Sequence, residues 1–220
     1  YGASSKDPAM FTEEMGPKQH PRSGFGKDVY EVESYVRGFA RRRSDVSVAV
    51  LRAANVIGPH VQTPMASYFR LPVIPTVLGF DARLQFLHEQ DLLAALQLAT
   101  LSDRAGVFNV AGDGILMMSQ AIRRLGKAAL PVPSFAVSGL GSTMKRARVA
   151  DFSGDQVAFL TYGRAVDTTK MRDLLGFEPT FSTAAAFADF AASVTPGAFA
   201  AERLEAVEKS VTSMIGGARG

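Results

Sequence analysis

The pattern of apolar and polar residues predicts a chain in which helices and strands alternate. Residues 1–24 are rich in Gly, Pro, Ser and charge, which indicates a surface loop. Over residues 25–42 the apolar side chains recur at helical spacing, which predicts a helix with one buried face. The run 46–51 is almost continuously apolar, as in a strand buried on both faces of a parallel sheet. It leads into the polar turn segment 55–59, and in such sheets ligands bind beyond the carboxyl ends of the strands.

A second group of elements follows this turn. Residues 61–83 mix Pro, Gly and apolar side chains, which indicates an excursion over the sheet rather than another layer. Residues 83–88 predict a strand, 90–101 an apolar helix, and 107–114 a strand closed by a turn. This order of strand, helix and strand is typical of a right-handed βαβ unit.

Beyond residue 114 the pattern is mainly helical. Helices are expected at 119–125, in a tract from about 134 to 149, at 168–175 and at 183–194. The predicted fold class is therefore α/β: the C-terminal half of a doubly wound parallel sheet of the Rossmann type, with a small, mostly helical lobe.

Composition narrows the class of protein. The 220 residues are 47% hydrophobic and 20% charged, enough to bury one core and a small second lobe. A net charge of +3 is too small to argue for nucleic acid or a membrane surface as partner. The sequence has no cysteine, no long apolar run and no signal-peptide pattern, so the cytoplasm is the expected location. His20, His60 and His88 lack the spacing of a metal site, and no metal is expected.

Several short motifs occur in one order along the chain. They are Tyr1-Gly2, which looks like the end of S-x-x-x-V-Y-G; Arg52, Asn55, Gly58 and Pro59, which match R-x-x-N-x-x-G-P; 85–91, similar to [DQ]-F-[IV]-H-V-x-D; 108–112, similar to F-N-[VI]-[AG]; and 167–179, similar to D-x-[ST]-K-x(n)-L-G-[FWY]-x-P. This order resembles that of the extended short-chain dehydrogenase/reductases, the NAD-dependent epimerases and dehydratases, over about residues 1–180.

The resemblance implies an organisation in three parts. Residues 1–112 would be the remaining half of a dinucleotide-binding (Rossmann-like) domain, with the substrate-side excursion at 61–83. Residues 113–197 would be a small substrate-binding lobe, and 198–220 a helical or frayed tail. The chain begins with Tyr rather than Met, and we expect it to be a truncated part of a longer parent.

The resemblance also implies ligands and binding residues. The parent would bind NAD or NADP and a nucleotide-sugar-like small molecule, and whether it is a homodimer stays open. Asn55 and His88 are the candidate substrate-binding residues. An Asn after a strand also often caps a turn, and for Arg52 and His88 the resemblance favours a role in holding the sheet ends and loops together.

The catalytic pair of the family is absent. The family uses Y-x-x-x-K, a tyrosine acid/base tuned by a lysine, usually with a glutamate four places after the lysine. If Glu33 is that glutamate, the tyrosine and lysine positions hold Phe25 and Val29, which have no ionisable group. With the alternative match, Glu31, they hold Ser23 and Lys27. The tyrosine is missing in either register, so the chain is expected to be inactive as it stands.

The cofactor motif is absent as well. Gly112-Asp113-Gly114 lacks a third glycine, and Gly139-Leu140-Gly141 does not follow a convincing strand, so both are interpreted as turns. The 220-residue chain is therefore expected to bind no NAD. One alternative is a non-catalytic sensor that binds a dinucleotide or sugar nucleotide with the same fold; another is that Lys27 or an upstream residue serves as an unusual acid/base. Without its neighbours, the apolar strand should expose an edge that captures partners or aggregates.

Overall fold

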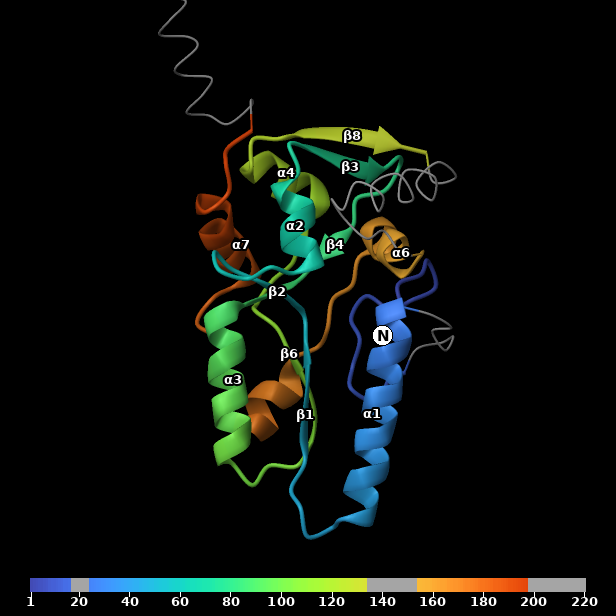
Figure 1. Ribbon diagram of the computed structural model, residues 1–220, viewed down its shortest axis with the longest axis vertical. Helices are drawn as coiled ribbons and strands as arrows, with labels where there is room; N and C mark the ends of the chain where they lie inside the picture. Colours follow the sequence, from blue (N-terminus) through green and yellow to red (C-terminus); the bar gives the residue numbers. More distant parts are fainter. Residues whose placement is uncertain (17–23, 134–153, 198–220) are drawn as a thin grey trace, which may run out of the picture.

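A computed structural model describes residues 1–16, 24–133 and 154–197 (Figure 1). Its helices are α1 (Gly24–Arg42), α2 (Pro64–Arg70), α3 (Glu89–Leu101), α4 (Met118–Arg124), α6 (Gly154–Tyr162), the short π-helix η1 (Met171–Leu175) and α7 (Thr183–Ala192). Its strands are β1 (Ala49–Ala53), β2 (Asn55–Ile57), β3 (Val73–Val77), β4 (Arg83–Leu84), β5 (Phe86–His88), β6 (Gly106–Val110), β7 (Leu116–Met117) and β8 (Ala128–Val132). None of these helices is long and apolar enough to cross a membrane.

Parallel strand pairs form the centre of the α/β fold, as the sequence predicts. β1 pairs with β6 from Ala49–Gly106 to Ala53–Val110, and β2 continues β1 and pairs with β5. The predicted order of strand, helix and strand is therefore present as β5, α3 and β6. These two strands do not pair with each other, because β5 pairs with β2 and β6 pairs with β1. Figure 1 shows α3 and α1 on opposite sides of β1. On the α3 side a core includes Ala95, Phe108 and Met171, all almost fully buried.

Two expectations about burial on the α1 side are wrong. β1 begins at Ala49 instead of Val46, and its side chains are half-buried or exposed rather than buried. The apolar face of α1 is largely open to solvent, with Val29 45%, Val32 62% and Tyr35 71% exposed, while Val36 and Phe39 are half-buried. The physical reason is that, within the described residues, no element packs extensively against α1 and β1 has one neighbouring strand.

The excursion at 61–83 contains a helix and a strand that the sequence pattern did not predict. Thr63 accepts a hydrogen bond from the Ala66 amide and so caps α2, whose first residue is Pro64, a favoured position for proline. β3 pairs in parallel with β8. Together with α4 and α7 these elements bury a second core, whose largest members include Phe69, Phe187 and Phe190. The division of the chain at residue 112 stays a prediction.

The helices predicted after residue 114 are found in part. α4 and α7 match the predicted helices at 119–125 and 183–194, while 168–175 contains the five-residue η1. Residues 128–132 form β8, which was not predicted. The tract expected to be helical up to residue 149 lies outside the described residues, as does the tail from 198.

Candidate functional site

Arg52 connects three separate segments of the chain. Its Nε and Nη2 atoms donate to the two carboxylate oxygens of Glu33 on α1, at 3.1 and 2.5 Å. Its Nη1 atom donates to the Tyr1 hydroxyl at 2.8 Å and to the Glu13 carbonyl at 3.0 Å. The side chains of Arg52 and Glu33 are only 14% and 19% exposed. We name this set of contacts the Arg52 clamp, and it fixes α1 and the N-terminal segment against β1.

The clamp governs the charge of Glu33. Burial alone would raise the pKa of this carboxyl group, but the guanidinium groups of Arg52 and Arg37 outweigh it and hold the pKa below its usual value. Burial has the larger effect on the Tyr1 hydroxyl and raises its pKa, although Arg52 opposes this shift. Tyr1 is therefore a neutral hydrogen-bonding group at neutral pH.

Asn109 extends the clamp into the core. It stands opposite Arg52 in the β1–β6 register and is fully buried. Its side-chain oxygen accepts from the Tyr1 hydroxyl at 2.6 Å, and its Nδ2 atom donates to the carbonyls of Phe11 and Asp167 at 3.0 and 3.1 Å. The sequence placed Asn109 in the F-N-[VI]-[AG] strand without a role. An Asn inside an apolar strand was the available signal, because a buried amide needs partners.

Asn55 differs from Arg52 and Asn109 in that no described residue holds its side chain by a hydrogen bond. It opens β2 directly beyond the carboxyl end of β1, where it pairs with Phe86. The residue is half-buried. Its side-chain amide makes no hydrogen bond to any described residue, whereas the side chains of Arg52 and Asn109 are fully engaged by protein groups.

His88, the other candidate from the sequence, has both ring nitrogens hydrogen-bonded and its ring stacked on a neighbour. It is fully buried, and its Nδ1 atom accepts from the Gln90 amide at 3.2 Å, which caps α3. The Nε2 atom must then carry the proton, and it donates to Asp189 on α7 at 3.0 Å. The ring also stacks on Phe181, with the ring centroids 3.8 Å apart. Both nitrogens therefore serve the junction between α3 and α7.

The G-P turn is fixed by Glu89. The Glu89 carboxylate accepts from the backbone amide and from the Nδ1 atom of His60, at 3.2 and 2.7 Å. A Cβ on Gly58 would lie 2.5 Å from the carboxyl carbon of Glu89, so a larger residue there would push the Glu89 side chain out of its contacts with His60. His60 is 85% exposed. His20 lies outside the described residues, and within them no three His, Cys, Asp or Glu side chains lie close enough to hold a metal.

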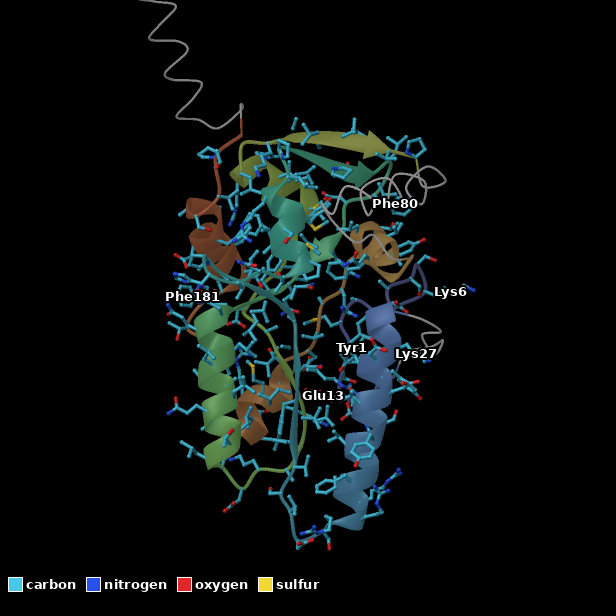
Figure 2. The ribbon with its side chains drawn as sticks, in the orientation of Figure 1. Tyr1, Lys6, Glu13, Lys27, Phe80 and Phe181 are labelled. Carbon is cyan, nitrogen blue, oxygen red and sulfur yellow. The ribbon has the colours of Figure 1, made fainter. Side chains whose placement is uncertain are left out.

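The positions of the family's catalytic pair lie in the first turns of α1. Phe25 and Val29 precede Glu33 by eight and four residues, and Glu33 faces β1 through the clamp. Lys27 instead pairs with Glu31 across 3.5 Å at the surface, where both side chains are about half exposed or more. Figure 2 shows Lys27 on the side of α1 that faces away from β1. Ser23 lies outside the described residues.

Of the glycines considered as cofactor motifs, Gly112 and Gly114 lie within the described residues. A Cβ on Gly112 would lie 2.6 Å from the backbone carbonyl oxygen of Phe181 and 3.0 Å from the Thr183 amide nitrogen. Gly112 is therefore needed where two protein segments meet, and Gly114 has the positive φ, 80°, of a turn. Gly139 and Gly141 lie outside the described residues.

Comparisons with curated proteins identify relatives but no activity. No protein-family model matches the chain. An uncharacterized protein of Mycobacterium tuberculosis strain H37Rv is 47% identical over 190 residues, which cover 86% of this chain and 50% of that protein. A second uncharacterized protein of the same strain is 26% identical over 182 residues, covering 80% of this chain and 20% of its own length. The chain thus spans half or less of the curated relatives it matches.

Solved structures with the same fold are enzymes that act on nucleotide sugars. A UDP-glucose 4-epimerase of Thermotoga maritima, solved with UDP-glucose, matches with a TM-score of 0.55 and 21% identity over 79% of this chain and 54% of the enzyme. A dTDP-glucose 4,6-dehydratase of Bacillus anthracis, solved with NAD, gives 0.61 and 18% over 87% and 57%. A UDP-glucuronic acid 4-epimerase of Bacillus cereus, also with NAD, gives 0.57 and 15% over 86% and 57%. The Rossmann-type fold predicted from the order of the motifs is therefore confirmed.

Proposed function

We propose that this chain, which has the fold of the nucleotide-sugar epimerases and dehydratases, supplies the substrate-side wall of a site for a nucleotide-sugar-like ligand. In this proposal the chain is part of a longer polypeptide whose other half would bind NAD or NADP. The neighbours solved with UDP-glucose and with NAD support both ligands for the whole protein. The cytoplasmic location remains a prediction, and whether the whole protein is a homodimer stays open.

The observation that carries the proposal is the side-chain amide of Asn55, which makes no hydrogen bond to any described residue and is not among the atoms buried away from water. An amide in this state can exchange its water for the donors and acceptors of a ligand. Asn55 lies beyond the carboxyl end of a parallel strand, where ligands bind in open α/β sheets. We assign ligand contact to Asn55 and not to His88, because both nitrogens of His88 are already bound.

The acid/base chemistry of the family is not available from this chain. The clamp between Glu33 and Arg52 favours the register that puts Phe25 and Val29 at the tyrosine and lysine positions. A phenyl ring and an isopropyl group can neither take up a proton nor stabilise a phenolate. Gly112 serves the contact between two protein segments, and we derive no hydride step from this chain.

Calorimetry on the natural polypeptide that contains this sequence tests ligand contact. Titration with UDP-glucose should give a measurable Kd, and Asn55→Ala should weaken binding about tenfold, the effect of losing one ligand hydrogen bond of roughly 1.4 kcal/mol. Gln97→Ala removes an amide from the exposed face of α3 and serves as the matched control, with no expected change. Equal affinity of the wild-type and Asn55→Ala proteins would refute the role of Asn55.

A second candidate function is binding without catalysis, as in a sensor or scaffold. The loss of both ionisable groups at Phe25 and Val29 favours it over a catalyst. Measuring NADH formation or epimerisation by the natural polypeptide separates the two. Turnover that persists in Lys27→Ala and disappears in a ligand-site variant would exclude the pure binding role and also exclude Lys27 as the acid/base.

A further inference from the structure

We propose that Glu89 is a positioning residue for Asn55, and that it acts by locking the turn that follows β2. This turn comprises residues 58–60 and comes directly after the strand that opens with Asn55. The role rests on the proposed function, since it serves the ligand contact assigned there to Asn55. The lock itself requires no ligand and can be measured without one.

The strand that carries Asn55 is short and needs support from outside. β2 has three residues and, among the described strands, pairs with β5 alone. On the side toward β1 the chain is anchored, because the Ala54 amide donates to the Val110 carbonyl at 2.8 Å. So few ladder hydrogen bonds offset little of the entropy lost in ordering a strand, and its free end frays unless other groups hold it. The position of Asn55 therefore depends on what holds the chain beyond Ile57.

Glu89 lies where the β2–β5 ladder ends. It follows His88, which pairs with Ile57, and its side chain lies against Gly58, whose Cβ, if present, would be 2.5 Å from the Glu89 carboxyl carbon. The carboxylate accepts from the His60 amide at 3.2 Å and from the His60 Nδ1 atom at 2.7 Å. These two hydrogen bonds tie the turn to the first residue of α3 and close the ladder.

The Glu89 side chain is itself held in place. It is only 14% exposed and lies in the first turn of α3, where the helix dipole favours a carboxylate. A carboxylate also accepts stronger hydrogen bonds than a neutral group does. In the stretch similar to [DQ]-F-[IV]-H-V-x-D, Glu89 stands at the place of the valine, which has no hydrogen-bonding side chain. The lock is therefore a property of this sequence and is not implied by the motif.

A fixed turn keeps the Asn55 amide in one arrangement before the ligand arrives. When only a fraction of the molecules holds the binding arrangement, the apparent Kd rises by the inverse of that fraction. If loss of the lock leaves about one molecule in five in that arrangement, the Kd should rise about fivefold. Glu89 would thus affect affinity without touching the ligand.

NMR of the natural polypeptide that contains this sequence tests the lock without ligand. Glu89→Ala should shift or broaden the backbone and side-chain amide resonances of Asn55, because β2 loses its support. Glu178→Ala is the control: it removes a carboxylate that is 69% exposed and binds Arg172 at 2.9 Å, and it should leave the Asn55 resonances unchanged. Asn55 resonances that are the same in Glu89→Ala and the wild type would overturn the proposal.

A double-mutant cycle with UDP-glucose tests whether Glu89 acts through Asn55. Glu89→Ala should weaken binding about fivefold in the wild type and should have no further effect in an Asn55→Ala protein. An equal loss in both backgrounds would assign Glu89 a merely structural role and overturn the proposal. Glu89→Gln keeps one acceptor oxygen for His60, should give an intermediate Kd, and replaces Glu89→Ala if that variant does not fold.

The two proposals fail in different measurements. Equal affinity of the wild-type and Asn55→Ala proteins refutes ligand contact by Asn55. The ligand-free spectra of the Glu89 variants still decide whether Glu89 fixes Asn55.

Discussion

The Arg52 clamp should be the strongest ionic interaction on the α1 side of the described structure. Removing one partner of a fully buried ion pair costs about 3–5 kcal/mol. The side chain of Arg52 is 14% exposed and that of Glu33 is 19% exposed, so solvent reduces this cost. We expect Glu33→Gln to lower the free energy of unfolding by about 1–2 kcal/mol, because Arg52 retains its bonds to Tyr1 and Glu13.

Arg52→Met should cost more, about 2–4 kcal/mol, since every hydrogen bond that Arg52 donates is lost and the half-buried Glu33 carboxylate keeps Arg37 but loses its Arg52 partner. A double-mutant cycle by urea unfolding, followed by circular dichroism, isolates the pair. Its coupling energy should be about 1.5–3 kcal/mol. The exposed pair of Arg43 and Asp45 is the control and should couple by less than about 1 kcal/mol. A coupling energy for Glu33 and Arg52 no larger than that of the control would refute the clamp.

Three further predictions follow from single positions. The stabilisation that the Glu33 carboxylate contributes should be complete above its unfolded pKa of about 4.3 and should be lost as pH falls through its lower folded pKa. A Glu33→Gln protein with the same acid unfolding curve as the wild type would argue against this. Gly112→Ala should lower the free energy of unfolding by about 1–3 kcal/mol, because its Cβ would lie 2.6 Å from a backbone oxygen. Gly2→Ala, whose Cβ would have nothing within 4 Å, is the control and should change the unfolding midpoint little. Similar midpoints for both variants would contradict the packing at Gly112. Phe25→Tyr combined with Val29→Lys should create or raise turnover in the natural polypeptide, and no gain with NAD and UDP-glucose present would count against the Glu33 register.

The regular elements with long, clear periodicity were predictable from the sequence. α1, α3 and β6 follow from apolar spacing alone, because each is long enough for its period to be recognised. β3 and β8 were missed since both contain proline, which normally argues against a strand. In a two-stranded pair each strand has a free edge, and there a proline such as Pro131 removes no ladder hydrogen bond if its nitrogen points outward.

The candidate site was predictable in position but not in the roles of its residues. The pattern placed Asn55 and Arg52 at the carboxyl end of a parallel strand, which the structure confirms. The pattern could not distinguish the role of Asn55 from that of Arg52, because the hydrogen-bond partners of Arg52 lie 19 to 51 residues away in the chain. Those of Asn109 lie up to 108 residues away. Long-range side-chain contacts of this kind depend on how the segments pack, and spacing along the sequence contains no record of it.

NMR of the Asn55 side chain tests the central claim most directly. In the natural polypeptide labelled with nitrogen-15, saturating UDP-glucose should shift the Asn55 amide resonances, because the ligand supplies a hydrogen-bond partner that no described residue provides. The Asn109 amide, which is fully buried and bonded to protein carbonyls, should stay unchanged as an internal reference. An unshifted Asn55 amide at saturation would contradict the assignment of this residue, and with it the substrate-side wall proposed for the chain.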